Sequence, residues 1–283
     1  MARNSSIEWT DHTFNPWWGC AKVSPGCTHC YAETWSKRVG LKVWGNQSAR
    51  RFFSDKHWGE PLKWNAEAKE QRQRKRVFCA SMADVFEARD ELSVWRERLW
   101  QLIMKTDWLD WLLLTKRPQN IDLMAPWTDE WPQNVWLGTT IEDQTRAEER
   151  LPSLLKHRAK TRFLSCEPLL GTVDLSQWIG NKRNSSLNPI DWVIAGGESG
   201  PNARPMLPRW VRTLRDQCRA EAIAFHFKQW GHWAPTQQLN HSSTVKEFWD
   251  DVAGEQIVME AKGKKVSGRR LDGITWDELP TAA

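Results

Sequence analysis

The chain lacks an uninterrupted apolar run of the roughly 18 to 20 residues that a membrane-spanning helix needs. Residues 1–6, with the sequence MARNSS, also lack the apolar segment of a secretory signal peptide. From these two features we expect a soluble, cytoplasmic protein with no membrane partner. Cysteine is scarce as well, at six in 283 residues. We expect these thiols to be reduced or to bind a metal, because disulfide frameworks belong to oxidising compartments.

Tyrosine is nearly absent, since Tyr31 stands alone beside 21 tryptophans and 9 phenylalanines. Many of the tryptophans must lie in the core, yet tryptophan also stacks well on nucleobases. The formal net charge of +5 permits a polyanionic partner without demanding one. The composition is therefore compatible with a nucleic-acid or nucleotide partner but does not establish it.

Three of the six cysteines, Cys20, Cys27 and Cys30, fall within one segment of eleven residues. Pro25-Gly26 provides a turn, so that one loop can present all three thiols to a single metal centre. Thiolates select soft centres, namely zinc, copper(I) or an iron–sulfur cluster, over hard cations. The segment therefore predicts a metal centre of one of these kinds.

The number of ligands bears on which centre is bound. Structural zinc takes four closed ligands, and no second cysteine pair with the expected spacing follows in the chain. A zinc site would thus need His12, His29 or a remote residue as its fourth ligand. A four-iron cluster can instead be held by three cysteines when a small molecule binds its open iron. The count favours the cluster; a zinc-stabilised, non-catalytic nucleic-acid-binding protein is the alternative.

Downstream of the cysteines, the chain repeats short apolar runs with little alternation, which are typical of strands buried on both faces of a parallel sheet. The runs are 77–81, 111–115, 135–139, 162–166, 192–195 and 224–228. Amphipathic helices are predicted between several of them. With a first strand predicted within residues 7–14, this gives seven βα units and an α/β fold built on a parallel barrel. We expect the barrel over residues 1–235 and a C-terminal extension over 236–283.

In a parallel barrel, active sites form at the carboxyl ends of the strands. Polar or charged residues end every predicted run, so we expect them to share one cavity with the cysteine loop. The candidates taken from these positions are Ser81, Asp84, Thr139, Thr140, Glu142, Cys166, Gly196, Gly197, Glu198 and Lys228.

The cysteine loop and the following Tyr31-Ala32 resemble the cluster-binding loop of the radical S-adenosylmethionine (SAM) superfamily, and more closely a phage- and prophage-associated branch with a three-cysteine motif. The usual spacing of three and then two residues becomes six and then two here. His29 replaces the aromatic residue that normally precedes the third cysteine. Further blocks that resemble the branch are 15–19, 196–201, 227–231, 268–273 and 276–278, so the likeness spans nearly the whole chain.

The resemblance implies a partial (β/α) TIM-like barrel in which Cys20, Cys27 and Cys30 bind a [4Fe–4S] cluster. One electron from the cluster would cleave SAM to a 5′-deoxyadenosyl radical, and a reductant such as a flavodoxin or a ferredoxin would supply it. The phage association, the basic charge and the tryptophans together predict a substrate in or around nucleic acid, either a base to be modified or repaired or a nucleotide precursor. No further cysteine cluster is present for a second iron–sulfur centre, which weighs against sulfur insertion.

Most candidates at the strand ends are predicted to contact SAM. Ser81 and Asp84 follow the second predicted strand, where Asp84 could take the ammonium group of SAM or cap a helix. Thr139, Thr140 and Glu142 follow the fourth predicted strand, near where the superfamily often contacts the ribose or carboxylate. A plain turn followed by a helix cap is the alternative for these three residues.

The remaining candidates carry two further predictions. Gly196 and Gly197 would let the backbone approach the cofactor closely, or would simply form a tight turn. Lys228 is a cation suited to a carboxylate or phosphate of the cofactor or of the substrate. As catalytic groups, Glu198 would project a carboxylate and Cys166 could donate hydrogen to a product radical, although a buried strand cysteine is the commoner occurrence.

Overall fold

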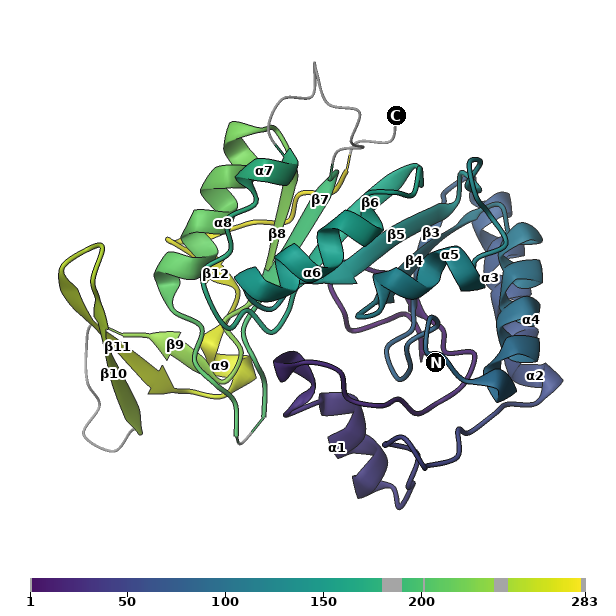
Figure 1. Cartoon of the computed structure of the whole chain (residues 1–283), viewed down its shortest axis with the longest axis horizontal. Coiled ribbons are helices and arrows are strands. Elements are labelled where there is room, and N and C mark those ends of the chain that lie inside the picture. The colour runs from purple at the N-terminus through teal and green to yellow at the C-terminus, as the bar shows by residue number, and fades with distance from the viewer. Residues whose placement is uncertain (1, 180–189, 201, 237–243, 281–283) are drawn as a thin grey trace.

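The computed structural model describes residues 2–179, 190–200, 202–236 and 244–280, so part of the predicted C-terminal extension lies outside the described residues. In these ranges no helix is long and apolar enough to cross a membrane. The main feature is an eight-stranded sheet whose strands lie side by side in sequence order, from β1 to β8 (Figure 1). The two end strands do not pair with each other, so the sheet is a curled half-barrel that stays open.

The sheet is parallel except at its first pair, where β1 (Ala2–Arg3) runs antiparallel to β2 (His12–Thr13). The other strands are β3 (Lys75–Cys79), β4 (Leu109–Thr115), β5 (Val135–Thr140), β6 (Thr161–Cys166), β7 (Trp192–Gly196) and β8 (Ala224–Gln229). Each of the six predicted apolar runs is therefore a strand, and the predicted α/β half-barrel is confirmed.

The first predicted strand is shorter than expected, because only His12–Thr13 of residues 7–14 joins the sheet. The backbone turns between Ile7 and Thr10, where the Thr10 N–H donates to the Ile7 carbonyl over 3.2 Å. The Thr10 hydroxyl then donates to the carbonyl of Arg76. The alternation of residues 7–14 thus belongs partly to a turn, which carries Trp9 into the concave face of the sheet.

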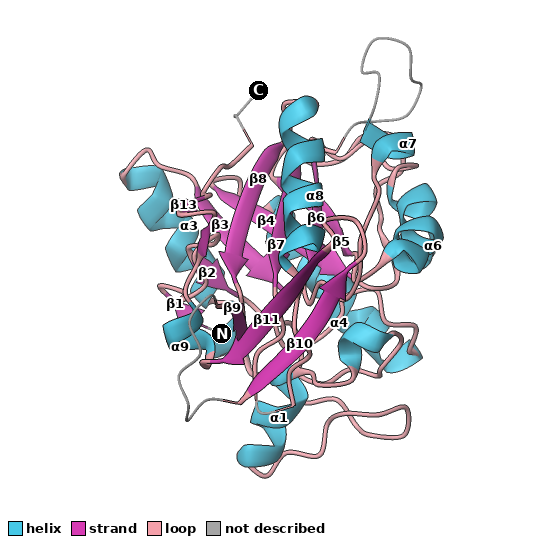
Figure 2. Ribbon diagram, turned by 90° about the vertical axis from the view of Figure 1, so that its left-hand side faces the viewer, coloured by secondary structure: helices cyan, strands magenta, loops and turns pink. Residues whose placement is uncertain are grey.

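Helices cover the convex face of the half-barrel (Figure 2). In chain order they are α1 (Tyr31–Arg38), α2 (Asp55–Trp58), α3 (Glu60–Glu70), α4 (Ser93–Met104), α5 (Ile121–Met124), α6 (Gln144–Leu154), α7 (Ser176–Ile179) and α8 (Pro208–Ala220). The exception is α1, which directly follows the cysteine loop and stands apart from the sheet (Figure 1). The main core lies between the other helices and the sheet.

Side chains alternate between the two faces of the half-barrel, because successive residues of a strand point to opposite sides. On β6, Leu164 and Cys166 pack in the main core. Phe163, one position earlier, packs instead with Phe78 and Trp192 in a smaller cluster on the concave face. The position of a residue in this alternation decides whether it can face a ligand inside the half-barrel.

The chain after β8 forms a second, three-stranded sheet. Its strands are β9 (Trp233–Pro235), β10 (Val245–Asp250) and β11 (Glu255–Ala261), in the spatial order β10-β11-β9. Since β9 precedes residue 236, this sheet includes residues on both sides of the predicted boundary. Figure 1 shows it projecting beyond α8.

The last described residues return to the half-barrel through α9 (Lys264–Ser267), β12 (Arg270–Leu271) and β13 (Ile274–Thr275). Residues 276–278 then run along β8, where the N–H of Phe227 donates to the carbonyl of Trp276 over 2.9 Å. This segment covers the outer edge of β8, whose hydrogen-bonding groups would otherwise be exposed.

Candidate active site

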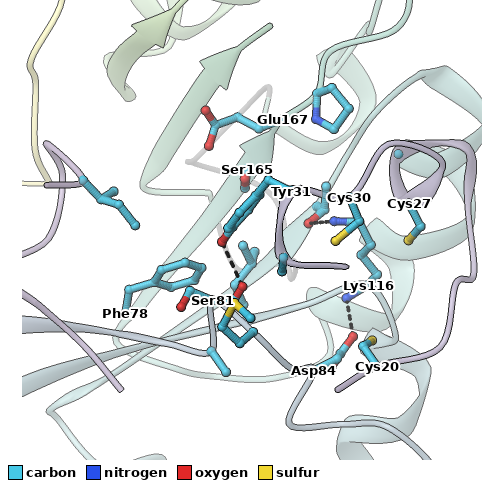
Figure 3. Close-up of a pocket in the computed structure, with 18 of the residues that line it drawn as sticks. Cys20, Cys27, Cys30, Tyr31, Phe78, Ser81, Asp84, Lys116, Ser165 and Glu167 are labelled. Carbon is cyan, nitrogen blue, oxygen red and sulfur yellow. Dashed lines mark hydrogen bonds between the residues drawn. The ribbon is translucent and has the colours of Figure 1, made fainter. Parts of the chain in front are cut away.

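A pocket of about 590 Å³ lies at the carboxyl ends of the half-barrel strands, next to the cysteine loop (Figure 3). Residues 5–9 and Lys264 of α9 complete its lining. The predicted site residues that line it are Cys20, Cys27, Cys30, Ser81, Asp84, Thr140, Gly197, Glu198 and Lys228. The shared cavity expected from the strand ends is thus present in the structure.

Four predicted residues do not line the pocket, and the alternation along the strands accounts for two of them. Thr139 and Cys166 are fully buried and point to the convex side, whereas their neighbours Thr140 and Ser165 line the pocket. The hydroxyl of Thr139 donates to the carbonyl of Thr115 over 2.9 Å. Burial raises the pKa of Cys166 well above its ordinary value. The structure therefore corrects the expectation that the Cys166 thiol faces the cavity.

The other two, Glu142 and Gly196, lie just behind the lining. Glu142 is fully buried and contacts the cysteine loop from outside the pocket. Gly196 ends β7, and a Cβ atom built on it would lie 2.5 Å from Oε1 of Glu167. Glu167 itself lines the pocket. The glycine thus leaves room for the carboxylate of Glu167, which follows the neighbouring strand.

The cysteine loop is fastened at Cys20 by a buried ion pair. Arg117 Nη1 lies 2.8 Å from Asp84 Oδ2 and 3.6 Å from the sulfur of Cys20, while Nη2 donates to the carbonyl of Ala21 over 2.8 Å. Asp84 also accepts from the hydroxyl of Thr115 and from the N–H of Lys116. Its carboxylate is therefore engaged within the protein, and it acts on the pocket by positioning Arg117.

The thiol of Cys20 is largely shielded from water, although the residue as a whole is partly exposed. Burial raises the pKa of Cys20 to about 12, although the guanidinium of Arg117 acts in the opposite direction. Burial also raises the pKa of Cys30. Both thiols are therefore protonated at neutral pH in the metal-free protein, and metal binding would release their protons.

A second carboxylate holds the middle of the loop. Arg150 Nη1 lies 2.6 Å from Glu142 Oε2, and the hydroxyl of Ser24 donates to Oε1 of the same carboxylate. The loop backbone approaches so closely that a Cβ atom built on Gly26 would lie 2.5 Å from Glu142 Oε1. The sequence feature Pro25-Gly26 thus provides a close approach as well as a turn.

A third carboxylate, Glu198, fixes the end of the loop. It lies 3.0 Å from Nδ1 of His29 and 2.6 Å from Nη2 of Arg204. Arg204 in turn donates to the carbonyl of Pro25 over 3.0 Å. The cations and hydrogen-bond donors around Glu198 lower its pKa despite burial, so it is ionised at neutral pH. Its observed contacts are those of a positioning residue rather than of a free catalytic base.

The donor set of the loop fits a soft metal centre, because three free thiols from one loop line one pocket. In the described ranges, no three His, Cys, Asp or Glu side chains converge closely enough to hold a metal. Metal binding therefore requires the thiols to turn toward one another. Of the two histidines considered as a fourth zinc ligand, His29 lines the pocket, whereas His12 stacks on Trp64 outside it.

Several lining residues were not among the candidates. Tyr31 extends into the pocket, where its hydroxyl donates to the carbonyl of Ser81 over 2.8 Å (Figure 3). Lys116 Nζ donates to the hydroxyl of Thr140 over 3.0 Å, and Glu167 pairs with Lys228. Lys116 and Glu167 both follow predicted strands, so period-two alternation was the signal that could have selected them. Nothing in the sequence indicated that residues 5–9 reach the pocket.

The fold and the site define an α/β half-barrel protein with a three-cysteine loop at its carboxyl-end pocket. The chain belongs to the family described as "Protein of unknown function (DUF5131)", whose model matches residues 4–280. No curated protein matches the sequence.

Two solved structures are similar to the chain, and both are mutants of spore photoproduct lyase. A cysteine-to-serine mutant shows a TM-score of 0.49 at 13% identity, covering 91% of this chain and 71% of the other. A double mutant with bound AdoMet and dinucleoside spore photoproduct shows a TM-score of 0.43 at 13% identity, covering 89% and 68%.

Proposed function

We propose that this protein is a radical SAM enzyme in which Cys20, Cys27 and Cys30 bind a [4Fe–4S] cluster. The observation that carries the proposal is the placement of three free thiols on one loop at the carboxyl-end pocket of a parallel half-barrel. Three protein ligands leave one iron open for the amino and carboxylate groups of SAM. When bound, the cluster would supply the electron that splits SAM into methionine and a 5′-deoxyadenosyl radical.

The contacts of the strand ends support separate roles for the polar residues. Three carboxylates pair with arginines and contact the cysteine loop, either directly or through the arginine. They are Asp84, Glu142 and Glu198, and they would hold the loop in position for the cluster. Ser81 and Thr140 line the pocket with hydroxyl groups and would hydrogen-bond SAM. With these roles, the cofactor would lie between the loop and the ends of β3 to β5.

The backbone and one cation complete the proposed cofactor site. Gly197 lines the pocket, where its backbone would approach SAM, and a Cβ atom built on it would collide with the carbonyl oxygen of Trp230. Any larger residue would thus displace this strand end. The ammonium group of Lys116 donates to the hydroxyl of Thr140, and it is suited to the carboxylate of SAM.

We further propose that the substrate is a nucleobase or a nucleotide-related molecule. The apolar residues Trp9, Phe78 and Leu114 line part of the pocket and suit a planar ring. Lys264 also lines it and would favour an anionic substrate. The electron would come from an external reductant such as a flavodoxin or a ferredoxin. The phage context and the cytoplasmic location stay predictions of the sequence.

Metal content after anaerobic reconstitution tests this proposal against the zinc alternative. Wild type and the variants Cys20→Ala, Cys27→Ala and Cys30→Ala would be loaded with iron and sulfide, and iron, sulfide and zinc would be quantified. The proposal predicts about four irons per chain in wild type and loss of the cluster in each variant. One tightly bound zinc and no iron would instead support a zinc site completed by His29.

A further inference from the structure

An ion pair stands on the pocket wall formed by β6 and β8. Lys228 Nζ, on β8, lies 3.1 Å from Oε2 of Glu167, which directly follows β6. The two side chains are 18% and 13% exposed. Among the described residues, neither charged group has another recorded hydrogen-bond partner. A carboxylate accepts several hydrogen bonds and an ammonium group donates three, so both can still bond to a ligand in the pocket.

The residue between these two strands makes room for the pair. Gly196 lies on β7, which separates β6 from β8 in the sheet. A Cβ atom built on Gly196 would lie 2.5 Å from Oε1 of Glu167 and 3.4 Å from its Cγ. The missing side chain therefore lets the carboxylate lie across β7 and reach Lys228. This contact gives the Gly196 position a physical reason that does not involve the cofactor.

The concave face nearer the amino ends of the strands is apolar. Leu114 pairs with Gly138 across β4 and β5, and Gly138 lies two residues before Thr140, so this layer lies deeper than the polar one. Trp9 and Phe78 pack edge to face there, with ring centroids 4.7 Å apart. The pocket therefore has an apolar base, and the carboxylate of Glu167 and the ammonium group of Lys228 lie side by side above it as an acceptor and a donor.

We infer that Glu167 and Lys228 recognise the edge of a cyclic amide or imide, in which a ring N–H stands next to a carbonyl group. The ring N–H would donate to the carboxylate, the carbonyl would accept from the ammonium, and the ring would pack on Phe78 and Leu114. Uracil, thymine, guanine and hypoxanthine present this edge, whereas adenine and cytosine do not. The inference rests on the proposed function and narrows its substrate to oxo-bases.

An amino-acid zwitterion would also match the two charges of the pair. Its charged groups would face the pair, so only an apolar side chain could cover Trp9 and Phe78, and it would do so without the planar contact that a base ring makes. An oxo-base would hydrogen-bond to both groups of the pair with its edge and would cover the apolar surface with its ring.

Binding of defined nucleosides to the reconstituted protein with SAM tests the inference. The probes are uridine, 3-methyluridine, in which a methyl group replaces the ring N–H, adenosine and methionine. Dissociation constants would be measured by ligand-observed NMR for wild type, Glu167→Gln and Lys228→Met. The matched control is Lys63→Met, which removes the same charge from the exposed pair with Glu60 on α3.

We expect uridine to bind wild type and Lys63→Met equally, and to bind Glu167→Gln and Lys228→Met at least tenfold more weakly. Adenosine and 3-methyluridine should bind wild type at least tenfold more weakly than uridine. Equal binding of uridine and 3-methyluridine, unchanged binding by both pocket variants, preferential binding of methionine, or no nucleoside binding would each overturn the inference. Iron content and 5′-deoxyadenosine formation, measured on the same preparations, report separately on the proposed function.

Discussion

The carboxylate of Glu198 lies 3.0 Å from Nδ1 of His29, although 169 residues separate them in the chain. Arg204 completes the contact, because it binds both Glu198 and the carbonyl of Pro25. The segment after β7 is thereby connected to the segment that carries Cys27 and Cys30. Contacts of this kind hold the loop before any metal is present, which reduces the entropy that metal binding must remove.

Replacing Glu198 with glutamine should loosen the cysteine loop. The variant loses the charge that pairs with Arg204 and His29, so Cys27 and Cys30 should react faster with a thiol reagent in the metal-free protein. Because Arg204 is partly exposed, we expect a modest loss in the free energy of unfolding, about 1–3 kcal/mol. Labelling rates followed by mass spectrometry of the two cysteines provide the measurement. Rates equal to those of wild type would contradict the positioning role.

The buried pair of Arg117 and Asp84 should be important for stability. Arg117→Met leaves the Asp84 charge without its partner, in surroundings where the two side chains are 8% and 7% exposed. The expected loss in the free energy of unfolding is about 3–5 kcal/mol. Urea unfolding of the metal-free variant provides the measurement.

The control is Arg74→Met, since Arg74 pairs with Asp110 and is 45% exposed. This variant should cost no more than about 1 kcal/mol. Adding Asp84→Asn to Arg117→Met should cost much less than the sum of the two single changes, because both remove the same interaction. An additive double variant would argue against a coupled pair.

Gly26→Ala should disturb the loop, because its Cβ atom would lie 2.5 Å from Glu142 Oε1. We expect lower iron content after reconstitution and a loss of about 1–3 kcal/mol in the free energy of unfolding. Gly59→Ala is the matched control, since its nearest neighbour would lie at an ordinary 3.5 Å and its φ angle of −77° suits alanine. Iron contents equal to that of wild type in both variants would show that cluster binding does not depend on the close approach of Gly26 to Glu142.

His226 should make the stability depend on pH. Burial next to Trp192, with the cations Arg269, Lys228 and Arg76 nearby, lowers its pKa to about 3. The carboxylate of Asp277 lies 3.7 Å away but is already paired with Arg269. The folded protein therefore binds fewer protons than the unfolded chain between about pH 6.5 and pH 3.

The free energy of unfolding should accordingly fall as the pH drops through this window, by up to about 1.4 kcal/mol per pH unit from this one group. His226→Phe keeps a buried ring without a titrating nitrogen, so its stability should fall less between pH 6.5 and pH 4 than that of wild type. Urea unfolding at a series of pH values measures both slopes. Parallel pH profiles would show that His226 is protonated in the folded state.

Much of the fold was predictable because strands buried on both faces leave continuous apolar runs in the sequence. The β6 run 162–166 is an example, and all six residues of β6 are buried. The strand predicted within residues 7–14 is shorter in the structure, because their alternation of polar and apolar residues also fits a turn followed by two strand residues. The edge segment 276–278 was not predictable as a partner of β8, because its pairing depends on an open sheet edge.

The sequence predicted which strand ends form the site, but not to which face of the sheet each side chain points. Thr139 and Thr140 are equally polar, yet only Thr140 lines the pocket, because period-two alternation separates them. The contacts of Glu142 and Glu198 with the cysteine loop could not be found from the sequence, since each joins residues more than 100 positions apart. Such contacts are a property of the closed fold.

The most direct test of the central claim is the EPR spectrum of the reduced, reconstituted protein before and after addition of SAM, with 5′-deoxyadenosine measured in the same samples. The account predicts a signal that depends on Cys20, Cys27 and Cys30, shifts on addition of SAM and is accompanied by 5′-deoxyadenosine. A cluster signal that SAM leaves unchanged, with no 5′-deoxyadenosine formed, would contradict it.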